Sequence, residues 1–516
     1  MKPQTVYSLI LLIILPCLNG YKILGVFPHP GKSHFDFFEP LMKELAHKGH
    51  EVTVISHFPQ KIPLKGYTDI SIVDGSHLKY NNVNITHFTG SRLQQHLNSH
   101  FLAQLGWAAC DNGYTQKAFQ DFLKSRPKFD VILMEYFNTD CYLPLAHILK
   151  APLIGLSSCA IMPWTNLQMG FPDNPGYVPI PFIGVHDKMT FFERVENTVL
   201  YLLTSVIYKL LIDIPSHETV KKHLGDDIPP LSEIAANTSL VLTNMHFSLT
   251  LPRPLPPGFI EVSGMNIGKS KKLPENLEKW ISGATHGVVY LSLGSMIKLH
   301  TFPEEKTKAF LKALGRLPQR VIWKWEAETL PDQPSNVMIQ KWLPQLDILC
   351  HPNVKAYIAH GGLLGTTEAV HCGVPMVVLP QFGDQFTNAK ALEKTKGGVV
   401  LDFWSLNENT LYDAVKTVLE PSFQESAKQL SDRFNDRPMP AMDTAIYWVE
   451  YVARHKGAPH LKTAAVGMPL YQYLLIDVIA FLLLVLFVVT YMFYFLVRTI
   501  FRKIFVRSSV KKLKKN

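Results

Sequence analysis

Residues 357–385 read YIAHGGLLGTTEAVHCGVPMVVLPQFGDQ, and this stretch decides the fold. Residues 356–359 and 376–379 are short apolar runs, each of the length expected for a buried strand. Between them, His360 is followed by two glycines, and Thr366 begins a segment with the pattern of a helix. Glycine lets a ligand approach the backbone, and a helix N-terminus offers free N–H groups to an anion. The order of strand, glycine turn, helix and strand therefore predicts an α/β unit with a ligand site at its turn.

Polar residues at both ends of this unit indicate the kind of ligand. His360 stands at the mouth of the turn, and Asp384 and Gln385 follow just past the second strand. This arrangement fits a nucleotide diphosphate that carries a polar group. The alternative is an ordinary α/β unit in which His360 and Glu368 are solvated surface residues.

The net charge of the chain is concentrated at its two ends. The chain has 516 residues, enough for several domains, and a formal net charge of +9. Lys2 and eight basic residues from Arg498 onward account for nine of the 51 Lys and Arg, and the other 42 balance the 42 Asp and Glu. Because the body between the ends is neutral, we expect no nucleic-acid partner.

Residues 1–20 have the composition of a secretory signal peptide, with Lys2, an apolar core and Gly20 before the expected cleavage point. Removal of Cys17 would leave five widely spaced cysteines, an odd number that predicts no disulfide framework for so large a domain. Asn84 and Asn237 each begin an Asn-x-Ser/Thr motif, and we expect them to carry N-glycans if this part of the chain is lumenal.

A second apolar segment lies near the C-terminus and predicts a transmembrane helix, assigned to residues 474–497. Its core, residues 478–497, is uncharged and spans about 30 Å as a helix, the hydrocarbon thickness of a bilayer. The basic tail, residues 498–516, should stay cytoplasmic, which predicts a type I membrane protein whose body faces the lumen. Lys512 and Lys514 resemble the dilysine signal for retrieval to the endoplasmic reticulum; attraction of the tail to anionic lipid is the alternative.

Two series of apolar runs alternate with helical segments in the body of the chain. The first series is assigned to residues 21–250 and the second to residues 286–440, and each is expected to form a parallel sheet covered by helices. Four prolines within residues 252–257 predict a stiff break, so residues 251–285 are assigned to the region that links the lobes. The predicted fold class is α/β, with two Rossmann-like lobes and one C-terminal transmembrane helix.

The 357–385 stretch resembles the donor-binding signature of the UDP-glycosyltransferases, from His360 through to the final Asp-Gln pair. The whole chain resembles the membrane-bound animal members of that family. The common features are a signal peptide, an acceptor lobe, a donor lobe, a return helix with a membrane approach over residues 441–473, one span and a basic tail. Residues 137–141, FNTDC, are closest to arthropod members. The resemblance implies the GT-B fold, with the substrates in the cleft between the lobes.

The resemblance implies that His34, in the loop after the first strand, is the general base that deprotonates the acceptor hydroxyl. An imidazole is suited to this role because its pKa lies near neutrality. A carboxylate should hold the imidazole, and two candidates follow the strand that ends near residue 134. We favour Asp140, which the arthropod-type pattern offers, over its rival Glu135, which stands where vertebrate relatives carry an Asp.

The resemblance also assigns the donor side. Two positions depart from the family pattern, because Ala359 replaces a hydroxyl residue and Leu364 replaces an Asn. The ten donor-binding residues implied are Trp342 and Gln345 for uracil, Glu368 for the ribose, Ser295, His360, Gly361, Gly365 and Thr366 for the pyrophosphate, and Asp384 and Gln385 for the sugar.

These features predict an inverting UDP-glycosyltransferase of the endoplasmic reticulum membrane. It would transfer a hexose, with glucose favoured, to a hydroxyl of a small lipophilic acceptor. The expected partners are the UDP-sugar as co-substrate, the acceptor and membrane lipid. We expect no cofactor and no metal, since the chain has no Asp-x-Asp motif and no zinc-type cluster. The alternatives are glucuronosyl transfer and a non-catalytic lumenal carrier on the same fold; the acceptor and a homo-oligomeric state stay open.

Overall fold

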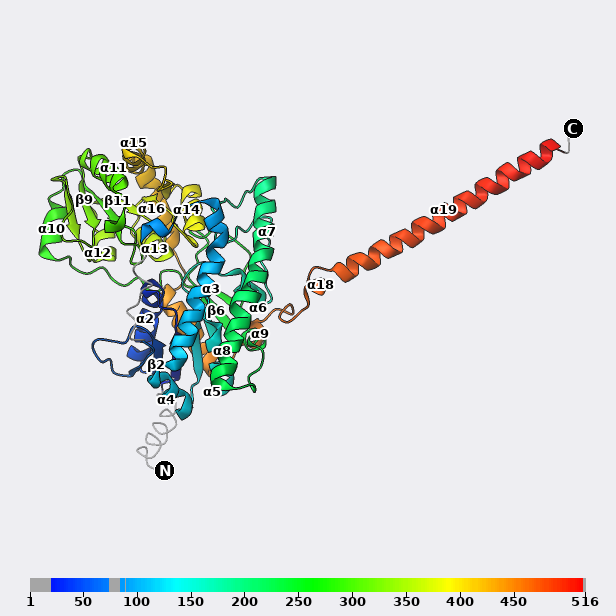
Figure 1. The fold of residues 1–516 in the computed structure, drawn as a ribbon, viewed down its shortest axis with the longest axis horizontal. Helices are drawn as coiled ribbons and strands as arrows, with labels where there is room; N and C mark the ends of the chain where they lie inside the picture. Colours follow the sequence, from blue (N-terminus) through cyan, green and yellow to red (C-terminus); the bar gives the residue numbers. More distant parts are fainter. Residues whose placement is uncertain (1–19, 74–83, 89, 514–516) are drawn as a thin grey trace, which may run out of the picture. The chain divides into compact units, whose positions relative to one another are not determined.

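The computed structural model describes residues 20–73, 84–88 and 90–513, and the chain divides into two compact units, Met1–Thr463 and Ala464–Asn516. The first unit contains two parallel sheets and the helices that cover them, and the second contains the long helix α19 (Figure 1). The predicted signal peptide, apart from Gly20, lies outside the described residues, and so does Lys514 of the tail.

Each sheet is made of parallel strands. In order across the first sheet, the strands are β3 (Tyr67–Ser71), β2 (Glu51–Ser56), β1 (Lys22–Phe27), β4 (Val131–Glu135), β5 (Leu153–Ser157), β6 (Leu240–Thr243) and β7 (Phe259–Glu261). In order across the second sheet, they are β10 (Val337–Gln340), β9 (Arg320–Lys324), β8 (Val288–Ser292), β11 (Val354–Ala359), β12 (Met376–Val378) and β13 (Gly398–Val400).

Each lobe contains its own set of α-helices. The first lobe contains α2 (Lys32–His47), α3 (Arg92–Thr115), α4 (Lys117–Ser125), α5 (Pro144–Leu149), α6 (Pro163–Gln168), α7 (Phe191–Tyr208), α8 (Ile214–Leu224) and α9 (Leu231–Ala236). The second lobe contains α10 (Glu275–Ser282), α11 (Glu304–Gly315), α12 (Gln345–Leu349), α13 (Leu363–His371), α14 (Gln385–Lys394), α15 (Glu408–Val418) and α16 (Pro421–Asn435).

The central strands explain why the sheets are covered on both faces. β4, β5 and β8 are buried along their whole length, which requires the continuous apolar runs that the sequence supplies there. Each lobe has two hydrophobic clusters that contain alternate residues of the same strands, for example Leu24 in one cluster and Ile23 in the other. The predicted α/β fold with two Rossmann-like lobes is therefore confirmed.

The strand order places a reversal of direction at the same point in both lobes. In the first lobe the chain runs from β1 through β2 to β3 and then returns to add β4 on the other side of β1. In the second lobe it runs from β8 through β9 to β10 and then adds β11 on the other side of β8. Open α/β sheets bind their ligands outside the carboxyl ends of the strands at such switch points. The fold thus directs attention to the loops after β1, β4, β8 and β11.

The proline-rich segment does not end the first lobe. The backbone N–H of Phe259 donates to Pro256 O, and β7 then pairs with β6 as an extra edge strand of the first sheet. The first sheet therefore extends to Glu261, and the chain enters the second lobe between that residue and α10. Proline is tolerated here because it precedes an edge strand, where it interrupts no central ladder.

A return helix, α17 (Ala441–His455), follows the second lobe and packs against the first. Its residues Ile446, Val449 and Val452 are buried in the cluster that also contains residues of α2 and of the first sheet. His50 adds a polar contact, since its Nε2 lies 3.2 Å from Glu450 Oε1. The helix predicted within residues 441–473 is thus a structural link between the lobes.

Four cysteines form two disulfides, which corrects the expectation drawn from the odd count. Cys110 of α3 pairs with Cys141, and Cys350 pairs with Cys372. Cys159 is free and buried. Both bridges close short loops, separated by 31 and 22 residues, within lobes that already have apolar cores. They are local links, and their pairing depends on tertiary contacts that the spacing of the cysteines does not reveal.

The second unit contains α18 (Leu470–Tyr473) and α19 (Ile476–Leu513). Within α19, residues Ile476–Phe505 are long and apolar enough to cross a membrane, and none of the most apolar part is buried against other parts of the chain. This helix contains most of the predicted span and suggests membrane anchoring.

Candidate functional site

A cavity of about 650 Å³ opens between the two lobes at the carboxyl ends of both sheets. His34, Ser158 and Cys159 line it from the first lobe. The second lobe contributes eight of the ten residues predicted to bind the donor, namely Ser295, Trp342, Gln345, His360, Gly365, Glu368, Asp384 and Gln385. The structure therefore brings together residues that lie far apart in the sequence.

His34 and Glu135 form the polar contact of the first lobe in this cavity. His34 lies in the first turn of α2, directly after β1, and Glu135 is the last residue of the neighbouring strand β4. His34 Nδ1 lies 2.5 Å from Glu135 Oε1 and 2.8 Å from Ser158 Oγ. The His29 and Phe137 rings pack on the imidazole, with centroids 4.4 and 4.7 Å away. One nitrogen of His34 is thus bound by a buried carboxylate, and the ring is held by packing.

Asp140 does not contact His34, contrary to the pairing that we favoured. It is buried and accepts hydrogen bonds from the Tyr208 hydroxyl and, at 3.3 Å, from Gln168 Nε2. Burial raises the pKa of Asp140 to about 6. The residue lies in the short 3-10 turn after β4 (Asp140–Tyr142), five positions past the strand end, and it faces α6 and α7 rather than α2. The rival candidate, Glu135, occupies the partner position.

His360 follows β11 and is enclosed by glycines. A Cβ atom on Gly294 would lie 2.7 Å from His360 Cε1, and one on Gly362 would lie 2.5 Å from His360 Nε2. These two glycines therefore make room for the imidazole ring, so one of the two glycines after His360 is needed for packing. Burial, with the charge of Lys324 as a second cause, lowers the pKa of His360 to about 4. The ring is neutral near pH 7, and its Nδ1 has no hydrogen-bond partner among the described residues.

The helix that follows begins earlier than predicted, at Leu363 with Gly362 as its N-cap. Thr366 is consequently inside the first turns and is fully buried, and it is not among the residues that line the cavity. Gly361 also lies behind the cavity wall, where its carbonyl accepts from Asn388 Nδ2 at 3.0 Å. The N-terminus that faces the cavity is formed by Gly362 to Leu364.

Gln345 and Glu368 are joined to each other in the wall of the cavity. Gln345 Nε2 donates to Glu368 Oε2 at 2.6 Å, and Gln345 Oε1 accepts from the hydroxyls of Tyr290 and Tyr357 at 3.2 and 3.0 Å. The two tyrosine rings are stacked with centroids 5.1 Å apart. Burial raises the pKa of Glu368 to about 7, so its charge changes close to physiological pH.

Trp342 presents a large aromatic surface to the cavity. Its side chain is 71% exposed although most tryptophans of the chain are packed, so its indole face is free for stacking. Ser295, in the loop after the carboxyl end of β8, also lines the cavity. Lys324, the last residue of β9, also lines it and donates to Gly294 O at 3.0 Å and to Glu326 Oε1 at 2.9 Å.

Asp384 and Gln385 lie at the N-terminus of α14. Asp384 Oδ2 accepts from Asn388 Nδ2 at 3.1 Å, and burial raises the pKa of this carboxyl group. His34, across the cleft, is close enough to lower the same pKa as a smaller cause. Gln385 Oε1 accepts from the backbone N–H groups of Gln381 and Phe382, which leaves its amide nitrogen as the group with hydrogens to donate.

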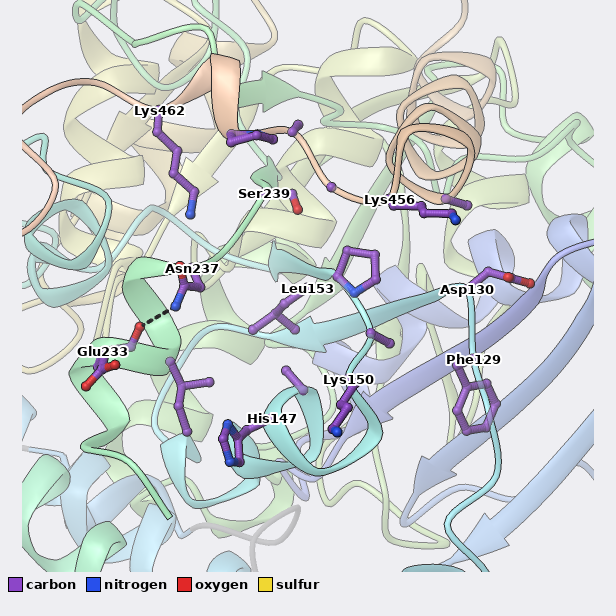
Figure 2. A pocket seen from close by; sticks show the side chains of 18 of the residues that line it. Phe129, Asp130, His147, Lys150, Leu153, Glu233, Asn237, Ser239, Lys456 and Lys462 are labelled. Carbon is purple, nitrogen blue, oxygen red and sulfur yellow. Dashed lines mark hydrogen bonds between the residues drawn. The ribbon is translucent and has the colours of Figure 1, made fainter. Parts of the chain in front are cut away.

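A second cavity, of about 690 Å³, lies at the opposite edge of the first sheet (Figure 2). It is lined by Leu153, where β5 begins, and by Lys150, Lys456 and Lys462. Ligands of open α/β sheets bind at the carboxyl ends of the strands, so this cavity is not the candidate for the chemistry. The predicted glycosylation site Asn237 lies on its rim, exposed, with its Nδ2 donating to Glu233 O.

The other predicted glycosylation site, Asn84, caps a 3-10 turn (Ile85–His87), and its Oδ1 accepts from Thr86 N. Among the residues that the structure describes, no group of three or more His, Cys, Asp or Glu side chains is arranged to hold a metal ion.

The family model for UDP-glucuronosyl and UDP-glucosyl transferases matches residues 24–512. The chain belongs to this family. It is a UDP-glycosyltransferase, as the donor signature indicated.

This UDP-glycosyltransferase is similar in sequence to known proteins over nearly its whole length. It is 43% identical to the UDP-glycosyltransferase UGT5 of Dactylopius coccus, over 95% of this chain and 94% of that protein. It is 38% identical to UDP-glucosyltransferase 2 of the same insect, over 98% of each chain, and 32% identical to the rat UDP-glucuronosyltransferase 1A7, over 94% of each. Among solved structures, the glycosyltransferase VinC in complex with DTDP is similar in fold, with a TM-score of 0.57, 18% identity and coverage of 84% of this chain and 100% of that one.

Sequence reasoning missed two residues of the UDP-glycosyltransferase site, Ser158 and Lys324. Both stand at the carboxyl end of a strand, Ser158 directly after β5 and Lys324 at the end of β9. The rule that directed attention to His34 applies equally to them. A systematic search of strand ends would have found both.

The raised pKa of Glu368 leads to a prediction about donor binding. Ribose hydroxyls donate to an ionised carboxylate, so binding of UDP-glucose should favour the charged form of Glu368. Because the folded-state pKa is about 7, affinity should be highest above pH 7 and should fall as the pH drops below it, by up to about tenfold per unit. Titration calorimetry with UDP-glucose between about pH 6 and pH 8 would measure the affinity as Glu368 ionises. Glu368→Gln should bind less tightly and with a flat profile; an unchanged slope in that variant would contradict the assignment.

Proposed function

We propose that the protein transfers glucose from UDP-glucose to a hydroxyl group of a small lipophilic acceptor, with inversion at the anomeric carbon. The observation that carries this proposal is the pair formed by His34 and Glu135, which enters the cavity from the lobe opposite to His360 and Asp384. A base on one wall and a diphosphate-sized site on the other fit a direct displacement between two bound substrates.

His34 acts as the general base in this scheme. Glu135 accepts the Nδ1 hydrogen at 2.5 Å, so Nε2 carries the lone pair that takes the proton of the acceptor hydroxyl. The acceptor oxygen forms a bond to the anomeric carbon while the bond from that carbon to the diphosphate oxygen breaks. The bonding electrons leave with UDP, and Glu135 stabilises the imidazolium that results.

The leaving diphosphate meets positive and neutral donors on the second lobe. The N-terminus of α13 supplies backbone N–H groups from Gly362 to Leu364, and helix N-termini favour anions. Lys324 adds a buried cation at the end of β9, and neutral His360 adds a ring nitrogen. These groups stabilise the charge that develops on the departing oxygen.

The layer of side chains packed behind His34 and Cys159 is apolar, which supports a lipophilic acceptor. Phe137, whose ring packs on His34, belongs to a buried cluster with Cys159, Met162 and Trp164. An acceptor that reaches His34 from this side would exchange water for hydrocarbon contacts, at about 25 cal/mol for each Å² of apolar surface buried.

The protein is also proposed to reside in the endoplasmic reticulum membrane as a type I protein, with its body in the lumen and its basic tail in the cytoplasm. The support is the apolar helix α19 followed by the basic residues of the tail.

The catalytic pair is tested by three variants. His34→Ala should lower turnover by roughly two to four orders of magnitude, the usual contribution of a positioned base. Glu135→Gln should lose a comparable amount because the imidazole would lose its partner. Asp140→Asn is the matched control, an equally buried acid changed to its amide, and it should stay near wild type. UDP-glucose binding should persist in all three, since the donor contacts lie on the other lobe.

These variants distinguish the mechanism from its rivals. Loss of turnover in Asp140→Asn with normal turnover in Glu135→Gln, at equal thermal unfolding midpoints, would assign the partner role to Asp140. Normal turnover in His34→Ala would show that His34 is not the general base and would contradict the proposed mechanism. Binding of UDP-glucose by the wild type without turnover of any phenolic acceptor would favour the carrier.

The carboxylate at position 384 supports the proposed choice of glucose. Asp384 lies where the sugar is proposed to bind, and the carboxylate of glucuronic acid would meet a like charge there. We expect kcat/KM for UDP-glucose to exceed that for UDP-glucuronate by at least about tenfold with the same phenolic acceptor, equivalent to about 1.4 kcal/mol. Equal or reversed values would assign the protein to glucuronosyl transfer.

The topology is tested in sealed microsomes. Added protease should remove only the tail beyond about Val497, and glycans on Asn84 and Asn237 should be protected, because the positively charged flank stays on the cytoplasmic side. Cleavage within residues 21–463 while the vesicles remain sealed would overturn the lumenal assignment.

A further inference from the structure

The helix α7 has polar residues on its inner face and apolar residues on its outer face. Asn197 is fully buried, where its Oδ1 accepts from Ile180 N at 2.8 Å and its Nδ2 donates to Val178 O at 2.9 Å. The buried Tyr201 hydroxyl accepts from Asp173 N at 3.1 Å, and Thr204 is also buried. A helix on the surface of a globular protein normally shows the reverse pattern.

The outer face of this stretch is a continuous apolar stripe. Its members recur at intervals of three and four residues, which places them on one side of a helix. Their side chains are 44–79% exposed, and Phe192 is the most exposed of them. We call this set the α7 stripe: Phe192, Val195, Val199, Leu203, Val206 and Leu210.

The charges around the α7 stripe are mostly basic or already paired. Glu193 caps the helix in a reciprocal pair with Thr190, and Glu196 forms an ion pair with Arg92. The exposed ionisable residues between positions 191 and 210 are Arg194 and Lys209, and Lys209 is paired with Asp213. An apolar face without unpaired acidic neighbours, and with Arg194 beside it, is compatible with a helix that lies in the interface of an anionic membrane.

The chain leaves the first unit close to this helix. Thr463 is the last residue of the unit, and its hydroxyl donates to Gly170 O at 3.2 Å. Gly170 follows α6, which packs against α7. From there, residues 464–475 lead to α19, the apolar helix that suggests membrane anchoring. The chain therefore leaves the first unit beside α6, the helix that packs against α7.

We propose that the α7 stripe docks onto the surface of the lipid bilayer. The helix lies in the membrane interface, with its apolar side chains at the boundary between headgroups and acyl chains and with the exposed Arg194 directed to anionic headgroups. It does not cross the membrane, because Asn197, Tyr201 and Thr204 are bound within the first lobe. Burial of the stripe removes a long exposed apolar surface from water, which explains why the sequence keeps it.

The experiment uses the full chain in vesicles of phosphatidylcholine with a minority of phosphatidylserine. Of the described cysteines, four are in disulfides and Cys159 is buried, so an added surface cysteine becomes the site for an environment-sensitive fluorophore. The probe position is Val206→Cys, in the C-terminal half of the stripe. The matched control is Ile62→Cys, an apolar residue that is 80% exposed in the loop between β2 and β3.

In vesicles whose acyl chains are brominated, the fluorophore at position 206 should lose several times more emission than the one at position 62. Adding Leu203→Glu to the Val206→Cys chain should reduce that loss, because the change removes apolar contact without touching a buried residue. Equal quenching at both positions would overturn the proposal. So would a disulfide between two copies of the unlabelled Val206→Cys chain, together with absence of quenching in the labelled chain, since a second copy would then cover the stripe. Neither readout depends on turnover, so the result is separate from the proposed reaction.

Discussion

The packing of α17 against α2 and the first sheet is the contact on which the site depends. The chain enters the second lobe once, after β7, and α17 carries it back, so the two lobes are joined at two places. The buried residues of this helix, Ile446, Val449 and Val452, each contribute about 1.5–3 kcal/mol by leaving water. Because His34 lies in the first turn of α2, the helix that α17 covers, this packing also supports the proposed general base opposite the donor wall.

Further contacts hold the lobes in register on the other side of the cavity. The Phe88 and Phe382 rings stack with centroids 4.6 Å apart, and Thr387 Oγ1 donates to Ile183 O at 3.1 Å. Phe382 and Thr387 flank Asp384 and Gln385 in the sequence, so the segment proposed to bind the sugar is fixed against the first lobe. A base on one lobe and a sugar site on the other can be aligned within hydrogen-bond distances only when such contacts set the width of the cleft.

The sequence was sufficient for the fold class and for most of the residues that line the cavity from the second lobe, because both depend on local order. Strand, glycine turn and helix follow one another in the chain, and the carboxyl ends of parallel strands must meet at one edge. The choice between Asp140 and Glu135 was different. Both follow β4, and only the three-dimensional turn of the chain decides that Glu135 points to α2 while Asp140 points to Tyr208.

Other failures have the same origin. Thr366 looked like a helix start because hydroxyl residues often cap helices, but the backbone begins to turn at Leu363, where glycine serves as the N-cap. The disulfides and the strand β7 were missed because their partners lie far away or on an edge strand. In each case the local pattern was compatible with two structures, and a tertiary contact selected one.

The two faces of α7 have different environments in the first lobe. Its outer stripe is proposed to meet lipid, and its inner face ends at Tyr208, which stacks on Trp164 with centroids 5.3 Å apart and donates to Asp140. Trp164 donates to Phe137 O at 2.9 Å, and the Phe137 ring packs on the imidazole of His34. Tyr208 of α7 is thus linked to His34, the proposed base, through Trp164 and Phe137. Asp140 takes no part in the proposed proton transfer. It instead fixes Tyr208, and so the inner face of the helix beside which a lipophilic acceptor would pass.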